Sequence, residues 1–326
     1  MVHICNSLIH IYHYTLGAYH RAWYTEAKEM PKVWLNGKIV SEQRARVSIR
    51  AHALHYGTGV FEGIRFYDTK KGRAIFRLDD HVKRLRYSAA VIGVTNIPPP
   101  SAIRKAVTGI LRVHPYRSGY IRPIIFFGES TLGLSTHGLK ADFAVIVLPW
   151  KKYLAKISVS LKTARTRRFN PRAFNPNAKI SGVYVNSITA HHEAEQAQCD
   201  EALLLGDSGE VAEGAGENIF IVKRGVLYTP PPGNILPGIT RKTVFEIAKN
   251  FKIPAREKRL RLADLYHADE CFLTGTATEV TPVGRIDGKL INRGHVGPIT
   301  SQIRDRFQEI VHGRAPKYWH LLTFVD

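Results

Sequence analysis

The sequence predicts an α/β protein built from two domains, and three observations support this prediction. The chain has 326 residues, 44% of them hydrophobic and 23% charged, so it can bury a large core. Helix-type and strand-type patterns alternate along the chain from residue 30 onward. The composition changes at residues 149–154, so we expect a smaller α/β domain at 30–152 and a larger one at 153–326.

Residues 1–29 differ from the rest and are interpreted as an N-terminal extension. They carry little charge, and Met30, the only methionine besides Met1, directly precedes the first predicted strand. No carboxylate or cysteine completes a ligand set with the histidines of this stretch, so no metal site is expected. A secretory signal is not expected either, whereas an organellar presequence stays open because no acidic residue precedes Glu26. The histidines concerned are His3, His10, His13 and His20.

The net charge is strongly positive, at +20 from 47 Lys+Arg against 27 Asp+Glu. The basic residues are scattered apart from short clusters at 165–168 and 256–259, and they do not alternate with aromatic residues as in RNA-binding proteins. We therefore expect a solvated basic surface, small-molecule substrates and no nucleic-acid partner. No apolar run is long enough to predict a membrane span. Three dispersed cysteines indicate neither a disulfide framework nor a zinc site, which favours a reducing, cytoplasmic setting.

The first domain is predicted to open with a hairpin at Asn36-Gly37, a pair typical of tight turns. The stretch 52–65 has three glycines and several aromatic residues, and we interpret it as a strand-edge loop lining a pocket. A helix is predicted at 79–92, because apolar residues repeat on one face, acidic residues begin it and Gly93 ends it. The elements expected next are a second helix after the prolines 98–100 and strands at 119–127 and 142–148.

Two features of the strand pair 119–127 and 142–148 indicate contacts. Strand alternation places Tyr120 and Arg122 on one face, and a charged arginine in an otherwise apolar strand needs a partner. Between the strands, Leu132 and Leu134 lie on a predicted loop, where exposed leucines indicate contact with another surface.

In the second domain, the stretch 236–241 is the strongest candidate anion site. It is a tight loop that opens a predicted helix, and the free N–H groups at a helix start, with the Thr240 hydroxyl, suit a phosphate. A second short polar loop, 274–278, ends a predicted strand. The other expected elements are strands at 157–161 and 202–205, helices at 186–198 and 299–311, and hairpins closed at 223–225 and 287–288.

Two further stretches carry candidate chemistry. Lys179 lies in a loop-like context, where most lysines are solvated surface charges, but an amine removed from water can act as a nucleophile or form a Schiff base. The stretch 210–220 is predicted as one strand bent by Gly214 and Gly216, with Glu213 and Glu217 on either side. A carboxylate beside a glycine backbone can hold the ring nitrogen of a ligand.

These stretches resemble the signature motifs of class IV aminotransferases, and most closely those of branched-chain amino-acid aminotransferases. The resemblance rests on Ala-Lys-Ile-Ser-Gly-Val-Tyr at 178–184, Glu-Gly-Ala-Gly-Glu-Asn-Ile-Phe at 213–220 and further motifs in matching order from residue 30 to the C-terminus. It implies a fold-type IV enzyme with a small N-terminal α/β domain and a larger pseudo-barrel α/β domain, at least a homodimer, and pyridoxal 5′-phosphate as cofactor. It also implies transamination between L-leucine, L-isoleucine or L-valine and 2-oxoglutarate.

The same resemblance assigns roles to individual residues. Lys179 is the catalytic residue that carries the cofactor covalently, and the loop with Leu132 and Leu134 enters the pocket of a neighbouring subunit. The cofactor-binding residues are Arg84, Lys179, Tyr184, Glu213, Gly216, Glu217, Leu236, Gly238, Ile239, Thr240 and Thr276. The substrate-binding residues are Tyr56, Phe61, Gly63, Tyr120, Arg122, Leu132, Leu134, Tyr153, Thr276 and Ala277.

Small departures and alternative functions accompany this resemblance. Val183 stands where many relatives have Asn, and Ile180-Ser181 where many have a smaller pair, so local packing beside the lysine differs. D-amino-acid aminotransferases and aminodeoxychorismate lyases use the same lysine and glutamate, but the run 214–218 and the Tyr120/Arg122 pair favour the branched-chain type. A basic nucleic-acid-binding protein is the remote alternative, and it rests on the net charge alone.

Overall fold

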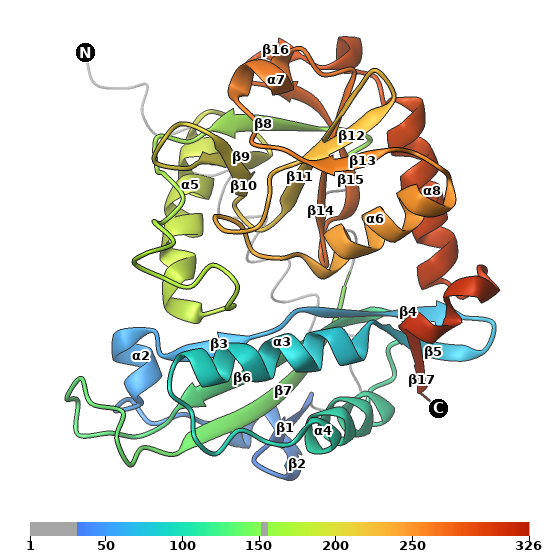
Figure 1. Ribbon diagram of the computed structural model, residues 1–326. Coiled ribbons are helices and arrows are strands. Elements are labelled where there is room, and N and C mark those ends of the chain that lie inside the picture. Colours follow the sequence, from blue (N-terminus) through green and yellow to red (C-terminus); the bar gives the residue numbers. More distant parts are fainter. Residues whose placement is uncertain (1–30, 151–155, 326) are drawn as a thin grey trace, which may run out of the picture.

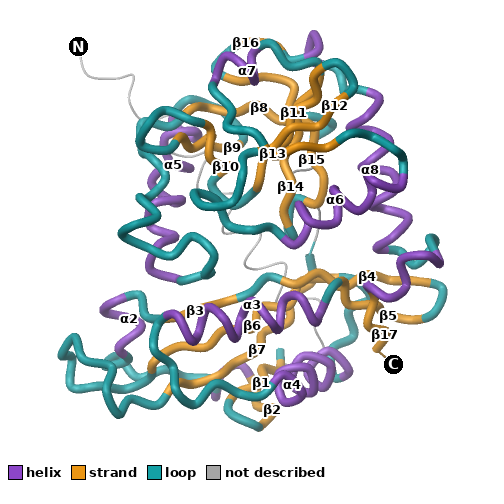
Figure 2. The backbone as a smooth tube through the Cα atoms, viewed as in Figure 1, coloured by secondary structure: helices purple, strands orange, loops and turns teal. Residues whose placement is uncertain are grey.

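The computed structural model describes residues 31–150 and 156–325, which form two β-sheets with helices packed on them (Figure 1). One sheet comes mainly from the first half of the chain and the other from the second half (Figure 2). The mixed α/β fold expected from the sequence is confirmed. The predicted extension at 1–29 and Tyr153 lie outside the described residues, and the domain division at 152/153 stays a prediction.

The first sheet has eight strands in the order β17-β5-β4-β6-β7-β1-β2, with β3 paired to β6, and all of its pairings are antiparallel. Its last strand comes from the C-terminus, where Leu322 lies opposite Phe76. The chain therefore returns to the first sheet after building the second. The strands are β1 (Lys32–Leu35), β2 (Lys38–Ser41), β3 (Gly59–Phe61), β4 (Ile64–Thr69), β5 (Gly72–Phe76), β6 (Gly119–Phe127), β7 (Ala141–Pro149) and β17 (Leu322–Val325).

Helices α3 (Leu78–Val91) and α4 (Pro100–Arg112) cover this sheet and share its apolar core. The predicted helix at 79–92 is confirmed, and its apolar stripe faces inward through Val82, Leu85 and Ala89. The stretch 52–65, expected to be a loop, instead contains α2 (His52–Tyr56), β3 and the start of β4, so that expectation was wrong. Phe61, an aromatic residue of this stretch, belongs to a paired strand and can also line a pocket. A short 3₁₀ helix, η1 (Glu42–Arg44), follows β2.

The second sheet has nine strands in the order β10-β9-β8-β15-β14-β11-β12-β13, with β16 paired to β15. The pairs β8·β9, β8·β15 and β12·β13 are parallel. The strands are β8 (Val159–Thr163), β9 (Glu201–Leu205), β10 (Val211–Gly214), β11 (Asn218–Lys223), β12 (Val226–Thr229), β13 (Ala255–Glu257), β14 (Glu270–Gly275), β15 (Glu279–Ile286) and β16 (Lys289–Leu290). The helices are η2 (Ser181–Val183), α5 (Tyr184–Gln196), α6 (Ile239–Asn250), α7 (Leu262–Tyr266), η3 (Asn292–Gly294), α8 (Pro298–Val311) and η4 (Pro316–Leu321).

The stretch 210–220 differs from its prediction as one bent strand. It forms two strands, β10 and β11, separated by a bend at 215–217 in which the Gly214 N–H donates to the Glu217 carbonyl at 2.7 Å. Glu213 therefore lies on β10 and Glu217 in the bend, and both residues are buried.

The predicted hairpins are confirmed, and each is closed by a residue followed by glycine with both φ angles positive. The pairs are Asn36-Gly37 (46° and 93°), Arg224-Gly225 (50° and 74°) and Asp287-Gly288 (47° and 80°). This is the conformation that two-residue hairpin turns require, and glycine adopts it without steric cost.

No helix within the described residues is long and apolar enough to cross a membrane. Cys199 and Cys271 are free thiols. The cytoplasmic setting stays a prediction.

Candidate active site

A cavity of about 520 Å³ lies between the two sheets and is lined by residues of both halves of the chain. It brings together most of the residues singled out from the sequence. These are Phe61, Gly63, Arg84, Tyr120, Arg122, Lys179, Tyr184, Glu213, Gly216, Glu217, Leu236, Gly238, Ile239, Thr240, Thr276 and Ala277. Residues separated by more than 200 positions thus line one cavity, of a size typical of small-molecule sites.

Three predicted substrate-binding residues do not line this cavity. Tyr56, Leu132 and Leu134 lie on the surface, and the Leu134 side chain is 81% exposed. The Tyr56 hydroxyl donates to the Leu132 carbonyl at 2.5 Å, so these residues support one another outside the cavity. Their substrate-binding roles stay predictions, as does that of Tyr153.

Lys179 belongs to the second half of the sequence but is fixed against the first sheet. Its carbonyl accepts from the Phe61 N–H at 3.1 Å, and its own N–H donates to Ser88 Oγ at 2.9 Å. Next to it, Gly57 and Gly182 are in backbone contact: a Cβ on Gly57, which has φ +66°, would lie 2.6 Å from Gly182 Cα. Only glycine allows this approach.

The amine of Lys179 points into the cavity between two aromatic rings. Its Nζ donates to the Tyr184 hydroxyl and lies 4.9 Å from the centre of the Phe61 ring. The two rings are themselves in tilted contact, with centres 4.9 Å apart. The backbone anchors on both sides of the lysine therefore hold its amine at one place on the cavity wall, where it can react with a bound carbonyl compound.

Glu213 is a buried carboxylate of the same cavity. Its side chain accepts from the Leu236 N–H and the Asn218 amide, both at 3.1 Å, and forms an ion pair with Arg168 at 2.8 Å. Burial raises the pKa of Glu213, and the charge of Arg168 and the Leu236 N–H offset this only in part. Such a carboxyl group can exchange a proton with a ring nitrogen placed beside it.

Arg168 was expected to belong to a solvated basic cluster, and this expectation was wrong. Its side chain is buried, lines the cavity and pairs with Glu213. No local pattern distinguishes it from the neighbouring Arg165 and Arg167, because its burial follows from the path of the loop before Lys179. The sequence offered no signal for it.

Arg84 is held by a buried carboxylate, Glu62, that the sequence did not single out. Glu62 is fully buried and accepts from Arg84 Nε at 2.5 Å and Nη2 at 2.9 Å, while His81 Nδ1 lies 2.7 Å from one of its oxygens. Burial raises the pKa of Glu62, but the charges and hydrogen bonds of Arg84 and His81 outweigh burial and bring it far below its usual range. Arg84 Nη1 donates to the Pro237 carbonyl at 3.1 Å, which places the guanidinium beside the start of α6.

That helix start supplies the backbone part of the anion site. Gly238 is the N-cap of α6, and Ile239 and Thr240 are its first residues. A Cβ on Gly238 would lie 1.9 Å from Asn218 Oδ1, so only glycine fits here. The first N–H groups of a helix lack acceptors within the helix and, with the Arg84 cation, suit a phosphate.

Unpaired polar atoms on the cavity wall fit a ligand with several acceptor groups. Within residues 31–150 and 156–325, no hydrogen-bond partner is present for Thr274 Oγ1, Arg168 Nε or Arg122 Nε, all of which are buried. All three residues line the cavity. Because buried donors are nearly always paired, these atoms fit a bound molecule that carries anionic and polar groups.

The far end of the cavity combines an arginine with aromatic surface. Arg122 Nη2 donates to the Tyr120 hydroxyl at 3.1 Å, and its guanidinium carbon lies 4.6 Å from the centre of the Phe61 ring. Trp150 stacks on Tyr120 with ring centres 4.8 Å apart. A Cβ on Gly63 would lie 1.9 Å from the Tyr120 hydroxyl, which requires glycine there. This end can therefore accept either a carboxylate or an apolar side chain.

Glu217 lies on the wall next to the 274–278 turn. Its oxygens accept from the Thr278 hydroxyl at 2.9 Å and the Gly216 N–H at 3.1 Å. Burial and the nearby charge of Glu201 raise the pKa of Glu217 to about 8, against these hydrogen bonds. Protonated Glu217 therefore contributes to the stability of the folded chain. This contribution is fully present at a pH below the ordinary pKa of 4.5 and is lost as the pH rises through about 8.

We predict that Glu217→Gln removes this pH dependence, because the amide keeps the shape of the protonated acid and does not titrate. The Tm of the wild-type chain should fall relative to that of the variant between about pH 5 and pH 9, as measured by thermal unfolding in a buffer series. Glu309→Gln, an exposed carboxylate on α8, is the control. A Tm difference that stays constant over this range would contradict the prediction.

Comparison with known proteins identifies the family of this chain. The family model of amino-transferase class IV matches residues 59–286. The branched-chain-amino-acid aminotransferase of Pseudomonas aeruginosa is 38% identical over 297 residues, which cover 90% of this chain and 97% of that protein.

Two solved structures match this chain over nearly their full length. The branched-chain amino acid aminotransferase of Escherichia coli has a TM-score of 0.89 at 37% identity, covering 91% of this chain and 100% of that one. The T.th. branched-chain amino acid aminotransferase complexed with N-(5′-phosphopyridoxyl)-L-glutamate has a TM-score of 0.89 at 43% identity, covering 91% and 99%. Because the family model spans well over half of the sequence and the fold agrees along nearly all of it, this chain belongs to the class IV aminotransferases.

Proposed function

We propose that this protein is a pyridoxal 5′-phosphate-dependent transaminase that exchanges the amino group between L-leucine, L-isoleucine or L-valine and 2-oxoglutarate. The observation that carries the proposal is the convergence of the Lys179 amine, the Glu213 carboxyl and the start of α6 in one cavity. The branched-chain aminotransferases named above support this substrate class.

The donor set of the cavity fits the cofactor. Arg84, Ile239, Thr240 and Thr276 would hold its phosphate, and Glu213 its ring nitrogen. The other residues assigned to cofactor binding would flank the ring, with Tyr184 on its phenolic oxygen; these are Gly216, Glu217, Leu236 and Gly238. When bound, the cofactor supplies an electron-withdrawing ring that takes up the electron pair left at the substrate Cα.

The side chains of the protein would transfer protons and orient the reacting groups. Lys179 Nζ would hold the cofactor through its carbonyl group, and the same amine, when free, would move a proton from the substrate Cα to the carbonyl carbon of the cofactor. Glu213 would keep a proton on the ring nitrogen, and its buried ion pair with Arg168 orients the carboxyl group. The Tyr184 hydroxyl accepts a hydrogen bond from the Lys179 amine and would orient this amine towards a bound substrate.

One pocket must accept two kinds of side chain. Phe61 and Tyr120 would contact a branched aliphatic group, and Arg122 the distal carboxylate of glutamate or 2-oxoglutarate. The backbone at Thr276 and Ala277 would receive the α-carboxylate of either substrate. The complex of the T.th. relative with phosphopyridoxyl-L-glutamate supports an acidic substrate in such a pocket.

We predict that Lys179→Ala abolishes turnover of L-leucine, L-isoleucine and L-valine with 2-oxoglutarate. The loss should be at least about 10³-fold in kcat, because one amine both carries the cofactor and transfers the proton. Formation of the 2-oxo acid and the visible absorbance of the purified protein are the measurements.

Lys258→Ala, an exposed lysine paired with Asp264, is the matched control and should keep full activity. Borohydride treatment of the wild-type protein should leave the cofactor on the peptide that contains Lys179. Substantial activity of Lys179→Ala would refute the assignment. Turnover of D-alanine by the wild-type protein, without turnover of the L-amino acids, would instead favour a D-amino-acid aminotransferase.

We predict that Arg122→Met separates the two half-reactions. The kcat/KM for 2-oxoglutarate should fall by about ten- to a hundredfold, the range expected for one charge-assisted contact, while that for L-leucine changes only a few-fold. Single-turnover kinetics with each substrate alone give the two values. Arg117→Met, an exposed arginine paired with Asp68, is the control. An equal loss with both substrates would contradict this role.

We also propose that the protein forms at least a homodimer. Several large apolar side chains are exposed on two hydrogen-bonded segments, α2 with its preceding loop and the loop between β6 and β7, at one end of the first sheet (Figure 1). They are Val47, Ile49, Leu54, Tyr56, Leu132 and Leu134. A cluster of this kind is typical of a protein–protein contact.

Light scattering should therefore give a mass of at least twice 36.7 kDa at micromolar concentration. Leu134→Asp should shift the protein towards the monomer, because a charge would be buried in the contact. Val185→Asp, an exposed apolar residue on α5, is the control. A wild-type protein that is monomeric under these conditions would exclude the dimer.

A further inference from the structure

Arg77 lies between the two parts of the proposed phosphate site, which are Arg84 on α3 and the start of α6. It is the N-cap residue of α3, and its carbonyl accepts the first hydrogen bond of that helix from the His81 N–H at 3.2 Å. Arg84, the cationic part of the site, lies on the same helix. The N–H of Arg77 donates to the Leu321 carbonyl at 2.7 Å. The position of Arg77 therefore determines where the helix that carries Arg84 begins.

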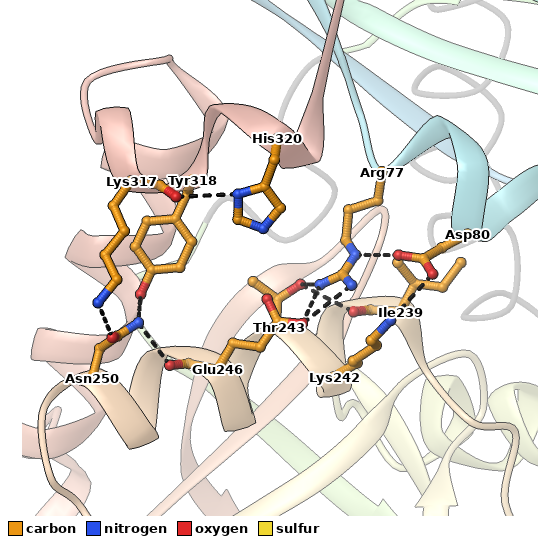
Figure 3. Close-up of polar contacts among 10 residues, drawn as sticks. All are labelled: Arg77, Asp80, Ile239, Lys242, Thr243, Glu246, Asn250, Lys317, Tyr318 and His320. Carbon is orange, nitrogen blue, oxygen red and sulfur yellow. Dashed lines mark hydrogen bonds and ion pairs between the residues drawn. The ribbon is translucent and has the colours of Figure 1, made fainter.

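The Arg77 side chain reaches from α3 to α6 in the other half of the molecule (Figure 3). Its Nη1 donates to Thr243 Oγ1 at 2.9 Å and to Glu246 at 3.1 Å, and its Nε donates to Asp80 at 2.6 Å. The side chain is only 2% exposed. A buried guanidinium is costly unless its N–H donors are satisfied, so these acceptors fix α6 against α3.

Thr243 extends this contact to the first turn of α6. Its buried hydroxyl accepts from Arg77 and donates to the Ile239 carbonyl at 3.1 Å. Ile239 and Thr240 form the helix start that faces the cavity. A continuous chain of hydrogen bonds thus runs from Arg77 to the backbone part of the anion site, and each bond polarises the next.

We propose that Arg77 is a positioning residue for the cofactor phosphate: it sets the start of α6 relative to Arg84, so that both reach the same phosphate. This inference rests on the proposed function. Arg77 is absent from the described residues that line the cavity, so it acts through Thr243 and through α3. The competing interpretation is that Arg77 only holds the two halves of the molecule together.

The two interpretations differ in what they predict for a ligand without a phosphate. The full chain freed of cofactor is titrated with pyridoxal 5′-phosphate and with pyridoxal, and the ratio of the two Kd values isolates the phosphate contribution. Arg77→Met should raise the Kd for pyridoxal 5′-phosphate about tenfold and change that for pyridoxal by less than about twofold. Asp80 and Glu246 are each about a third exposed, so they stay hydrated in this variant and the chain can fold.

Thr243→Val tests the same chain of hydrogen bonds without removing a charge. Valine keeps the size of the side chain but breaks the link to Ile239, so the preference for the phosphorylated ligand should fall in the same direction, by about threefold, the effect of one hydrogen bond. This variant keeps the proposal testable even if Arg77→Met does not fold.

Tyr318→Phe is the matched control, because it releases the other end of the same helix. There Asn250 donates to the Tyr318 hydroxyl and accepts from Lys317, far from the anion site (Figure 3). This variant should lose stability but keep the wild-type ratio of Kd values. Arg77→Met raising both Kd values equally, or neither, would overturn the positioning role. A wild-type chain that binds both ligands equally would refute the phosphate site itself, and this proposal with it.

Discussion

The two sheets that bound the cavity are joined by arginines that cross from one half of the molecule to the other. Arg65 on β4 lies 3.9 Å from Glu279 on β15, Arg77 bonds Thr243 on α6, and Arg84 bonds the carbonyl of Pro237 before the same helix. A guanidinium removed from water is costly unless its donors are satisfied, so the hydrogen-bonded crossings of Arg77 and Arg84 hold the two halves together. Because the cavity lies between the sheets, its shape is set by these contacts.

The proposed cofactor-binding groups Lys179 and Glu213 follow the same arrangement. Lys179 comes from the second half of the chain, yet its backbone pairs with the first sheet at Phe61. Glu213 and the start of α6 belong to the second sheet and its helices. The Lys179 amine is therefore held against the first sheet and the Glu213 carboxyl group by the second. A ring bound between them would contact both groups. The residues that position these groups contribute as much to the proposed chemistry as those that touch the ligand.

Several predictions that rested on local signals held. The Asn36-Gly37 and Asp287-Gly288 turns need only two residues with positive φ, and the helix at 79–92 needs only its own apolar stripe. Tyr120 and Arg122 share a face because strand side chains alternate, and both line the cavity. These features depend on neighbours in the sequence, so they can be derived without knowing the fold.

The sequence by itself thus determined the mixed α/β class, the hairpins and long helices, and the motifs that resemble class IV aminotransferases. Only the tertiary structure decided which charged residues are buried: Arg168 against Glu213, Glu62 under Arg84, and Arg77 between two helices. It also decided that the last strand joins the first sheet and that Tyr56 is not among the described residues that line the cavity. The physical reason is that burial and charge pairing depend on contacts between residues far apart in the chain. Local sequence periodicity does not predict these contacts.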